Sequence, residues 1–292
     1  MPTTSYINIT VVDEPMNYPT DQLLRYTFID QDVRGELVQL TSSYQRMLQG
    51  HDYAAPVQRL LGELMAATSL LTATLKFEGH IALQLQGDGP INFLAVNGSH
   101  HQQLRGIARV REAISDEQTG LRELLGKAVM VITLTPLEGE RYQGVVSGDG
   151  DSIAEIIENY FMQSEQLNTR LWLHADGEHA AGMLLQVMPA AGKDLTGFEH
   201  LQHLTATMTA AELYSLPGTE VLHRLYHEEQ VEVYPPMPVS FECGCSRERT
   251  LEALATVEPS ELHEILTQDG EIVMTCEYCN AQYVFSEADL VG

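Results

Sequence analysis

The chain has no cysteine in its first 242 residues, and all four of its cysteines lie in the last 50. A secreted domain held by disulfides would more often spread its cysteines across the fold, so this clustering indicates metal binding or redox chemistry. The chain also lacks an apolar run approaching the ~18 residues that span a bilayer. Its first residues lack the basic segment and apolar stretch of a signal peptide. We therefore expect a cytoplasmic protein with no membrane partner.

Basic residues are scarce as well. Sixteen Lys and Arg stand against 41 Asp and Glu in 292 residues, which gives a formal net charge of −25. Such a surface repels phosphate backbones, so we expect no nucleic-acid partner, because that function needs clustered cations. The same charge keeps a protein soluble while some apolar surface is exposed. Hydrophobic residues make up 44% of the chain, enough for a packed core.

The periodicity after position 20 predicts an α+β fold, with mixed or antiparallel sheets backed by helices. Residues 56–77 carry apolar side chains at the spacing of a helix with a broad buried face. Residues 80–85 alternate, a glycine-containing turn follows, and residues 91–96 are apolar, which predicts a hairpin. We expect a second strand pair at 129–135 and 142–146, joined by a turn at residues 138–140, further strands at 170–174 and 183–188, and a helix at 153–161.

The character changes after about position 192. Residues 201–213 and 219–227 predict two helices, with Thr209 and Glu212 as a capping box, and the proline-rich residues 231–238 predict an extended connector. Helices packed into the first domain's core remain the alternative for this region. We expect four parts: a loosely ordered N-terminal extension at 1–20, an α+β domain at 21–192, a helical linker at 193–242 and a small C-terminal domain at 243–292.

The cysteines of the last part form two close pairs: Cys243 and Cys245, then, after thirty residues, Cys276 and Cys279. Zinc prefers four soft or borderline ligands in a tetrahedron, and thiolates serve this well. Two cysteines at i,i+3 on a hairpin tip can point the same way, and two at i,i+2 share one face of an extended strand. A segment of ~50 residues cannot bury enough apolar surface to fold unaided, so metal binding and folding would be one event.

Spacing alone leaves three uses of this site open: a static structural zinc ribbon, a redox-switched site and a catalytic dithiol. A thioredoxin-type dithiol is disfavoured because Cys276 and Cys279 do not open a βαβ unit and the other pair would have no role. Each close pair could form a short disulfide without large backbone movement. This property favours a redox-switched site more than the mere presence of two cysteine pairs would.

Other motifs carry less information. His200 and His203 share a helical face, and His223 lies near Glu228, but no third ligand follows at convincing spacing, so we expect ordinary surface histidines. The glycines at 87–89 and 148–150 lack the Lys-Ser/Thr of a phosphate-binding loop and predict turns. No nucleophile or metalloprotease motif is present, and we expect no enzymatic activity.

The cysteine spacing resembles that of the redox-regulated chaperones of the heat shock protein 33 family. Further segments resemble the family at residues 69–77, 84–90, 140–146, 225–229, 241–249 and 270–272. The resemblance covers roughly residue 21 to the C-terminus. Residues 1–20 look additional, and Met16 is a plausible alternative start. We expect deletion of residues 1–15 to leave folding intact, which thermal unfolding of the shortened chain would check.

The resemblance implies a function. Reduced Cys243, Cys245, Cys276 and Cys279 would bind one zinc ion. Oxidants would pair Cys243 with Cys245 and Cys276 with Cys279, zinc would be lost, and the small domain and linker would unfold. The exposed surface would hold unfolding client proteins without ATP, and the oxidised protein would form homodimers. The alternatives are a static zinc-ribbon adaptor, which would bind its partner in either redox state, and a zinc enzyme, which would need an open coordination position.

Overall fold

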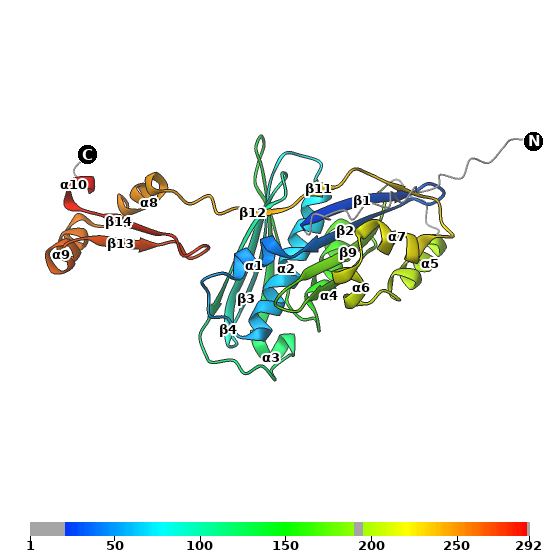
Figure 1. Ribbon diagram of the computed structural model, residues 1–292, viewed down its shortest axis with the longest axis horizontal. Helices are drawn as coiled ribbons and strands as arrows, with labels where there is room; N and C mark the ends of the chain where they lie inside the picture. The colour runs from blue at the N-terminus through cyan, green and yellow to red at the C-terminus, as the bar shows by residue number, and fades with distance from the viewer. Residues whose placement is uncertain (1–20, 190–194, 291–292) are drawn as a thin grey trace, which may run out of the picture.

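The computed structural model describes residues 21–189 and 195–290, and it contains two six-stranded sheets with a long helix between them (Figure 1). The first sheet has the order β10-β1-β2-β9-β8, with β11 also pairing β1. Its strands are β1 (Gln22–Phe28), β2 (Val33–Leu40), β8 (Thr169–Ala175), β9 (Ala180–Val187), β10 (Val231–Val233) and β11 (Met237–Pro238). The residues predicted as an extended connector thus form two short strands at the edge of this sheet.

The second sheet has the order β12-β5-β4-β3-β6-β7. Neighbouring strands run antiparallel, except that β12 lies parallel to β5. Its strands are β3 (Gly79–Gly87), β4 (Ile91–Ser99), β5 (Gln103–Val110), β6 (Ala128–Pro136), β7 (Tyr142–Ser147) and β12 (Ser240–Phe241). The two hairpins predicted from alternation, β3–β4 and β6–β7, are confirmed. Together with the helices, these sheets confirm the α+β class.

Helix α2 (Ala55–Ala73) occupies the space between the sheets. It is buried on nearly every side, because its leucines contact inward-facing residues of both sheets in one core. Pro56 lies in its first turn, where the missing N–H costs nothing. The predicted helix at 56–77 is therefore present but ends four residues earlier. The same layer contains α1 (Ser42–Leu48), α3 (Leu121–Leu125) and α4 (Ile153–Tyr160), with α4 continuing into a π-helical turn, Phe161–Glu165.

Three helices cover the outer face of the first sheet: α5 (Thr196–Thr205), α6 (Ala210–Ser215) and α7 (Gly218–Tyr226). Their core includes Leu24, Tyr26 and Phe28, which alternate along β1 with residues that face away. The single helix predicted at 201–213 is wrong: it is divided between α5 and α6. The predicted capping box is confirmed at the start of α6, where Thr209 and Glu212 satisfy each other's backbone N–H groups.

The C-terminal elements lie beyond β12 at one end of the molecule (Figure 1). They are α8 (Arg247–Leu254), α9 (Pro259–Asp269), the hairpin β13 (Ile272–Thr275) and β14 (Gln282–Phe285), and α10 (Glu287–Leu290). Their own core has only three buried side chains, those of Leu254, Ile272 and Phe285. This region therefore has little hydrophobic stabilisation of its own.

The prediction that residues 1–15 are dispensable concerns a segment outside the described residues. Across 21–189 and 195–290, no helix combines the length and apolar character needed to cross a bilayer.

Candidate metal centre

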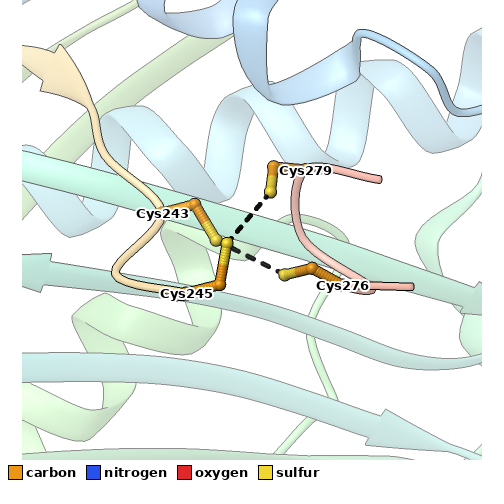
Figure 2. Close-up of side chains that lie close together, drawn as sticks. All are labelled: Cys243, Cys245, Cys276 and Cys279. Atoms are coloured by element: carbon orange, nitrogen blue, oxygen red, sulfur yellow. Dashed lines mark hydrogen bonds between the residues drawn. The ribbon is translucent and has the colours of Figure 1, made fainter. Parts of the chain in front are cut away.

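The four cysteines lie on two separate segments that face each other (Figure 2). Cys243 and Cys245 follow directly after β12, whereas Cys276 and Cys279 lie in the turn between β13 and β14. All four Sγ atoms lie within 4.8 Å of one another. Cys243 Sγ is 3.5 Å from Cys276 Sγ, and Cys245 Sγ is 3.4 Å from Cys279 Sγ. The structure thus brings together every cysteine that the sequence predicted as a ligand.

The second pair is held by a tight turn that we call the knuckle, residues 276–280. The Asn280 N–H donates to the Cys276 carbonyl at 2.8 Å, and the Cys276 N–H donates to the Ala281 carbonyl at 2.9 Å. Asn280 closes the turn with φ of 56°, in the left-handed region that asparagine tolerates better than most residues. The turn points both sulfurs to the same side, as the i,i+3 spacing predicted.

The first pair is fixed by the start of α8. Ser246 caps this helix by accepting from the Arg249 N–H, so the chain leaves the extended Cys-Gly-Cys segment directly into a helix. The Arg249 guanidinium donates back to the Gly244 carbonyl, between the two cysteines. Each pair is therefore held by local hydrogen bonds, and tertiary contacts bring the two pairs together.

These sulfurs suit a tetrahedral metal ion. With Zn–S bonds of ~2.3 Å, neighbouring sulfurs of a tetrahedron lie roughly 3.8 Å apart, close to the two shortest separations here. Within residues 21–189 and 195–290, no other group of three or more His, Cys, Asp or Glu side chains meets the same proximity criterion. His200 contacts Glu229 Oε1 at 2.9 Å, and His203 contacts the Glu199 carbonyl at 2.6 Å. The centre can hold a metal ion, and its four thiols are compatible with zinc.

The thiols differ in their electrostatic surroundings. Burial, reinforced by neighbouring thiols, raises the pKa of Cys243 to about 12. Burial also tends to raise the pKa of Cys245, but hydrogen bonds from the Tyr283 hydroxyl and neighbouring thiols outweigh it and lower the pKa to about 7. The Tyr283 hydroxyl lies 3.2 Å from Cys245 Sγ. One sulfur of the centre is therefore stabilised as a thiolate by the protein itself.

The chain is similar in sequence to known proteins along most of its length. The sequence model of the family described as Hsp33 protein matches residues 21–286. The chain belongs to the Hsp33 family. A 33 kDa chaperonin of Shewanella sediminis is 57% identical over 270 residues, covering 92% of this chain and 94% of that protein. A 33 kDa chaperonin of Pectobacterium carotovorum is 53% identical over 274 residues, with coverages of 92% and 94%. The Hsp33 family is thus a family of chaperones.

A solved Hsp33 structure has the same fold. The crystal structure of the 33 kDa chaperonin, or heat shock protein 33 homologue, of Thermotoga maritima superposes with a TM-score of 0.80 at 21% identity. The match covers 92% of this chain and 96% of that one, so the shared fold extends over most of both chains.

Sequence reasoning missed two residues of the site. Tyr283 was not assigned a role, although alternation along β14 places it on the same side of the strand as the buried Phe285. Arg249 carries no sequence signal, because its contact with Gly244 depends on how α8 follows the first cysteine pair. The disulfide pairing implied by the family resemblance stays a prediction, because all four cysteines are free thiols in this structure.

Proposed function

We propose that this Hsp33 protein is a redox-regulated, ATP-independent holdase chaperone. The observation that carries the proposal is the convergence of Cys243, Cys245, Cys276 and Cys279 in a region whose own core has only three buried hydrophobic side chains. In the reduced state the four thiolates would bind one zinc ion, which supplies the free energy that the small core lacks. The chain is then closed and inactive.

Oxidation would convert the four thiolates into two disulfides, Cys243–Cys245 and Cys276–Cys279. With hypochlorous acid as oxidant, each disulfide takes two thiolates, one HOCl and one proton, and yields chloride and water; the sulfur pair loses two electrons and chlorine gains them. Disulfide sulfurs have lost the thiolate charge, so the chain can no longer retain the ion.

Pairing within each segment, rather than between segments, has a structural consequence. The shortest sulfur separations in the closed state run between segments, from Cys243 to Cys276 and from Cys245 to Cys279. Disulfides at those positions would join the two segments covalently and preserve the fold. Disulfides between Cys243 and Cys245 and between Cys276 and Cys279 leave the segments unconnected, so only this pairing lets the centre open.

Opening would then spread to the linker. In the proposed division, residues 21–192 form the chaperone domain, 193–242 the linker and 243–292 the redox switch. Helices α5, α6 and α7 have 10, 6 and 9 residues, lengths at which isolated helices are marginal in water. Their release would expose Leu24, Tyr26 and Phe28 on the first sheet, an apolar face suited to unfolding polypeptides. This is an order-to-disorder switch driven by local covalent chemistry.

Further parts of the proposal follow from composition and family. We expect the protein to work in the cytoplasm, to bind unfolding clients, to form homodimers when oxidised, and to catalyse no reaction. The net charge of −25 would keep the opened chain soluble.

The test follows zinc, thiols and activity together. Reduced protein is treated with increasing hypochlorous acid while a chromogenic chelator reports zinc, a thiol titration counts free cysteines, and light scattering reports aggregation of a heat-unfolded client. We expect one zinc per chain before oxidation and suppression of aggregation only after zinc and thiols are lost. Unchanged zinc content in the active form would defeat the proposal. Partner binding that ignores redox state would instead support the static zinc-ribbon adaptor.

A further inference from the structure

The knuckle binds the outer face of the second sheet, the face turned away from α2. The Arg105 guanidinium lies 4.5 Å from the centre of the Tyr278 ring, and Asn97 Nδ2 donates to the Tyr278 hydroxyl at 3.3 Å. Arg109 Nη2 forms an ion pair with Glu277 Oε2 at 2.6 Å. Glu277 and Tyr278 lie between the two cysteines of the knuckle, so the metal centre and this docking contact share one turn of chain.

Two more contacts hold the metal centre against the rest of the protein. Asn280 Nδ2 donates to the Gly50 carbonyl at 2.7 Å, at the end of α1. The segment that leads to Cys243 also lies against β5, the strand whose arginines contact the knuckle. Ser240 and Phe241 of β12 pair with Gln103 and Leu104 of β5. Both halves of the metal centre are therefore anchored along β5.

The surrounding face is partly apolar. Register pairs Ala95 with Ile107 and Val131 with Val145 on the side opposite to α2. Ala95 and Ile107 are buried, whereas Val145 is 66% exposed. Phe93 lies under the Arg109 guanidinium at 5.3 Å. The face thus combines apolar side chains with two arginines along β5, a local basic edge on a protein whose net charge is −25.

We propose that this face is a redox-gated docking surface for polypeptide segments that carry an aromatic residue next to a carboxylate. In the closed state the knuckle itself occupies it, with Tyr278 against Arg105 and Glu277 against Arg109. In the opened state, segments of the same chemistry in an unfolding client take its place. This inference rests on the proposed function and adds a second client surface, distinct from the sheet face beneath α5–α7.

The contacts explain how the metal centre gates this surface. An exposed ion pair and a single cation–π contact are each weak, so the knuckle occupies the face because it is tethered there in the required turn. That turn depends on the left-handed Asn280 and on two sulfurs held on one side. Opening of the centre frees the knuckle from Cys243 and Cys245 and unfolds the small domain around it. Even with Cys276 and Cys279 joined, Glu277 and Tyr278 are then no longer held beside β5, so their effective concentration there falls.

The experiment uses full-length protein and a dye-labelled peptide of residues 270–285 with Cys276→Ser and Cys279→Ser. A reference peptide carries Glu277→Lys and Tyr278→Ser in addition. Fluorescence anisotropy measures both peptides against reduced, zinc-bound protein and oxidised protein. We expect oxidised protein to bind the first peptide at least about threefold more tightly than the reference, and reduced protein to bind it at least about threefold more weakly than oxidised protein.

Variants locate the preference. The double variant Arg105→Gln/Arg109→Gln should lose it after oxidation, whereas Arg122→Gln/Arg141→Gln removes the same charge elsewhere and should retain it. Arg105→Lys keeps the charge but not the planar group, so it should give an intermediate preference. Circular dichroism of each reduced variant confirms folding.

Equal binding by reduced and oxidised protein, or a preference retained by the Arg105→Gln/Arg109→Gln variant, would overturn the inference. Aggregation and zinc-release assays on the same preparations keep the two proposals apart. Oxidised wild type that fails to suppress aggregation contradicts the proposed function, whereas active oxidised protein without the peptide preference contradicts only this surface.

Discussion

Replacing Phe285 by alanine should weaken zinc binding although Phe285 is not a ligand. Its ring is fully buried and forms the C-terminal core with Leu254 and Ile272, at the end of the strand that follows the knuckle. The Arg247 guanidinium lies over the ring at 4.5 Å, so the side chain is enclosed from both sides. Phe285 is the largest of the three buried side chains in this small core.

The expected magnitude follows from the coupling of folding and metal binding. Truncating a buried phenylalanine to alanine costs about 3–5 kcal/mol. Where a domain folds only with its metal, that cost appears in the binding free energy of the metal, for which structural zinc sites give roughly 10–16 kcal/mol. Since about 1.4 kcal/mol corresponds to a tenfold change in affinity, the zinc dissociation constant should rise roughly a hundred- to several-thousand-fold.

Competition with a chromogenic chelator measures this affinity on reduced full-length protein. Val273→Ala is the matched control, because Val273 lies on the same hairpin with 48% of its side chain exposed. It should change the dissociation constant by less than about threefold. Thermal unfolding of the sheet domain should be the same in both variants and wild type.

A Phe285→Ala variant that binds zinc as tightly as wild type would refute the reasoning. Such a result would mean that the sulfurs form a complete site without the surrounding fold, and that losing the metal need not unfold the domain.

Three further changes should have measurable effects. Tyr283→Phe removes the hydroxyl that donates to Cys245 Sγ at 3.2 Å. Loss of such a supporting contact should weaken zinc binding about 10- to 100-fold, measured by chelator competition. An unchanged affinity would show that Tyr283 has no role at the centre. Thr205→Val removes the buried 2.5 Å hydrogen bond between the Thr205 and Tyr226 hydroxyls that joins α5 to α7. Loss of this buried partner should cost about 1–3 kcal/mol, so hydrogen exchange in 196–226 should accelerate, and unaltered protection would contradict this. Burial raises the pKa of Glu36 to about 7 despite Arg34 and Arg25, so the folded state holds its proton between pH 4.5 and 7 while the unfolded state releases it. The free energy of unfolding should therefore fall by roughly 3 kcal/mol as pH rises through this window, and Glu36→Gln should remove that loss. Equal pH slopes in denaturant titrations of the two proteins would exclude this account.

The elements predicted from sequence were those with strong local signals. Apolar strand patterns around turns identified the β3–β4 and β6–β7 hairpins, and helical spacing identified α2. These signals are local, because the buried face of a strand or helix recurs at a fixed spacing along the sequence. The division between α5 and α6 was missed. There, Thr205 hydrogen bonds back to the Leu201 carbonyl and outward to Tyr226, so a tertiary partner fixes the end of the helix.

The sequence by itself determined the chemistry of the metal centre: two close cysteine pairs, four soft ligands, and a tail too small to fold alone. Ligand identity and spacing are local properties, and coordination geometry is nearly independent of the fold. Only the tertiary structure decided where that centre lies. Arg105 and Arg109 reach the knuckle from 168 or more positions away because the fold places β5, beside the edge strand β12, against the turn of the C-terminal hairpin. Contacts between distant segments depend on packing of the whole chain, which no local pattern of residues records.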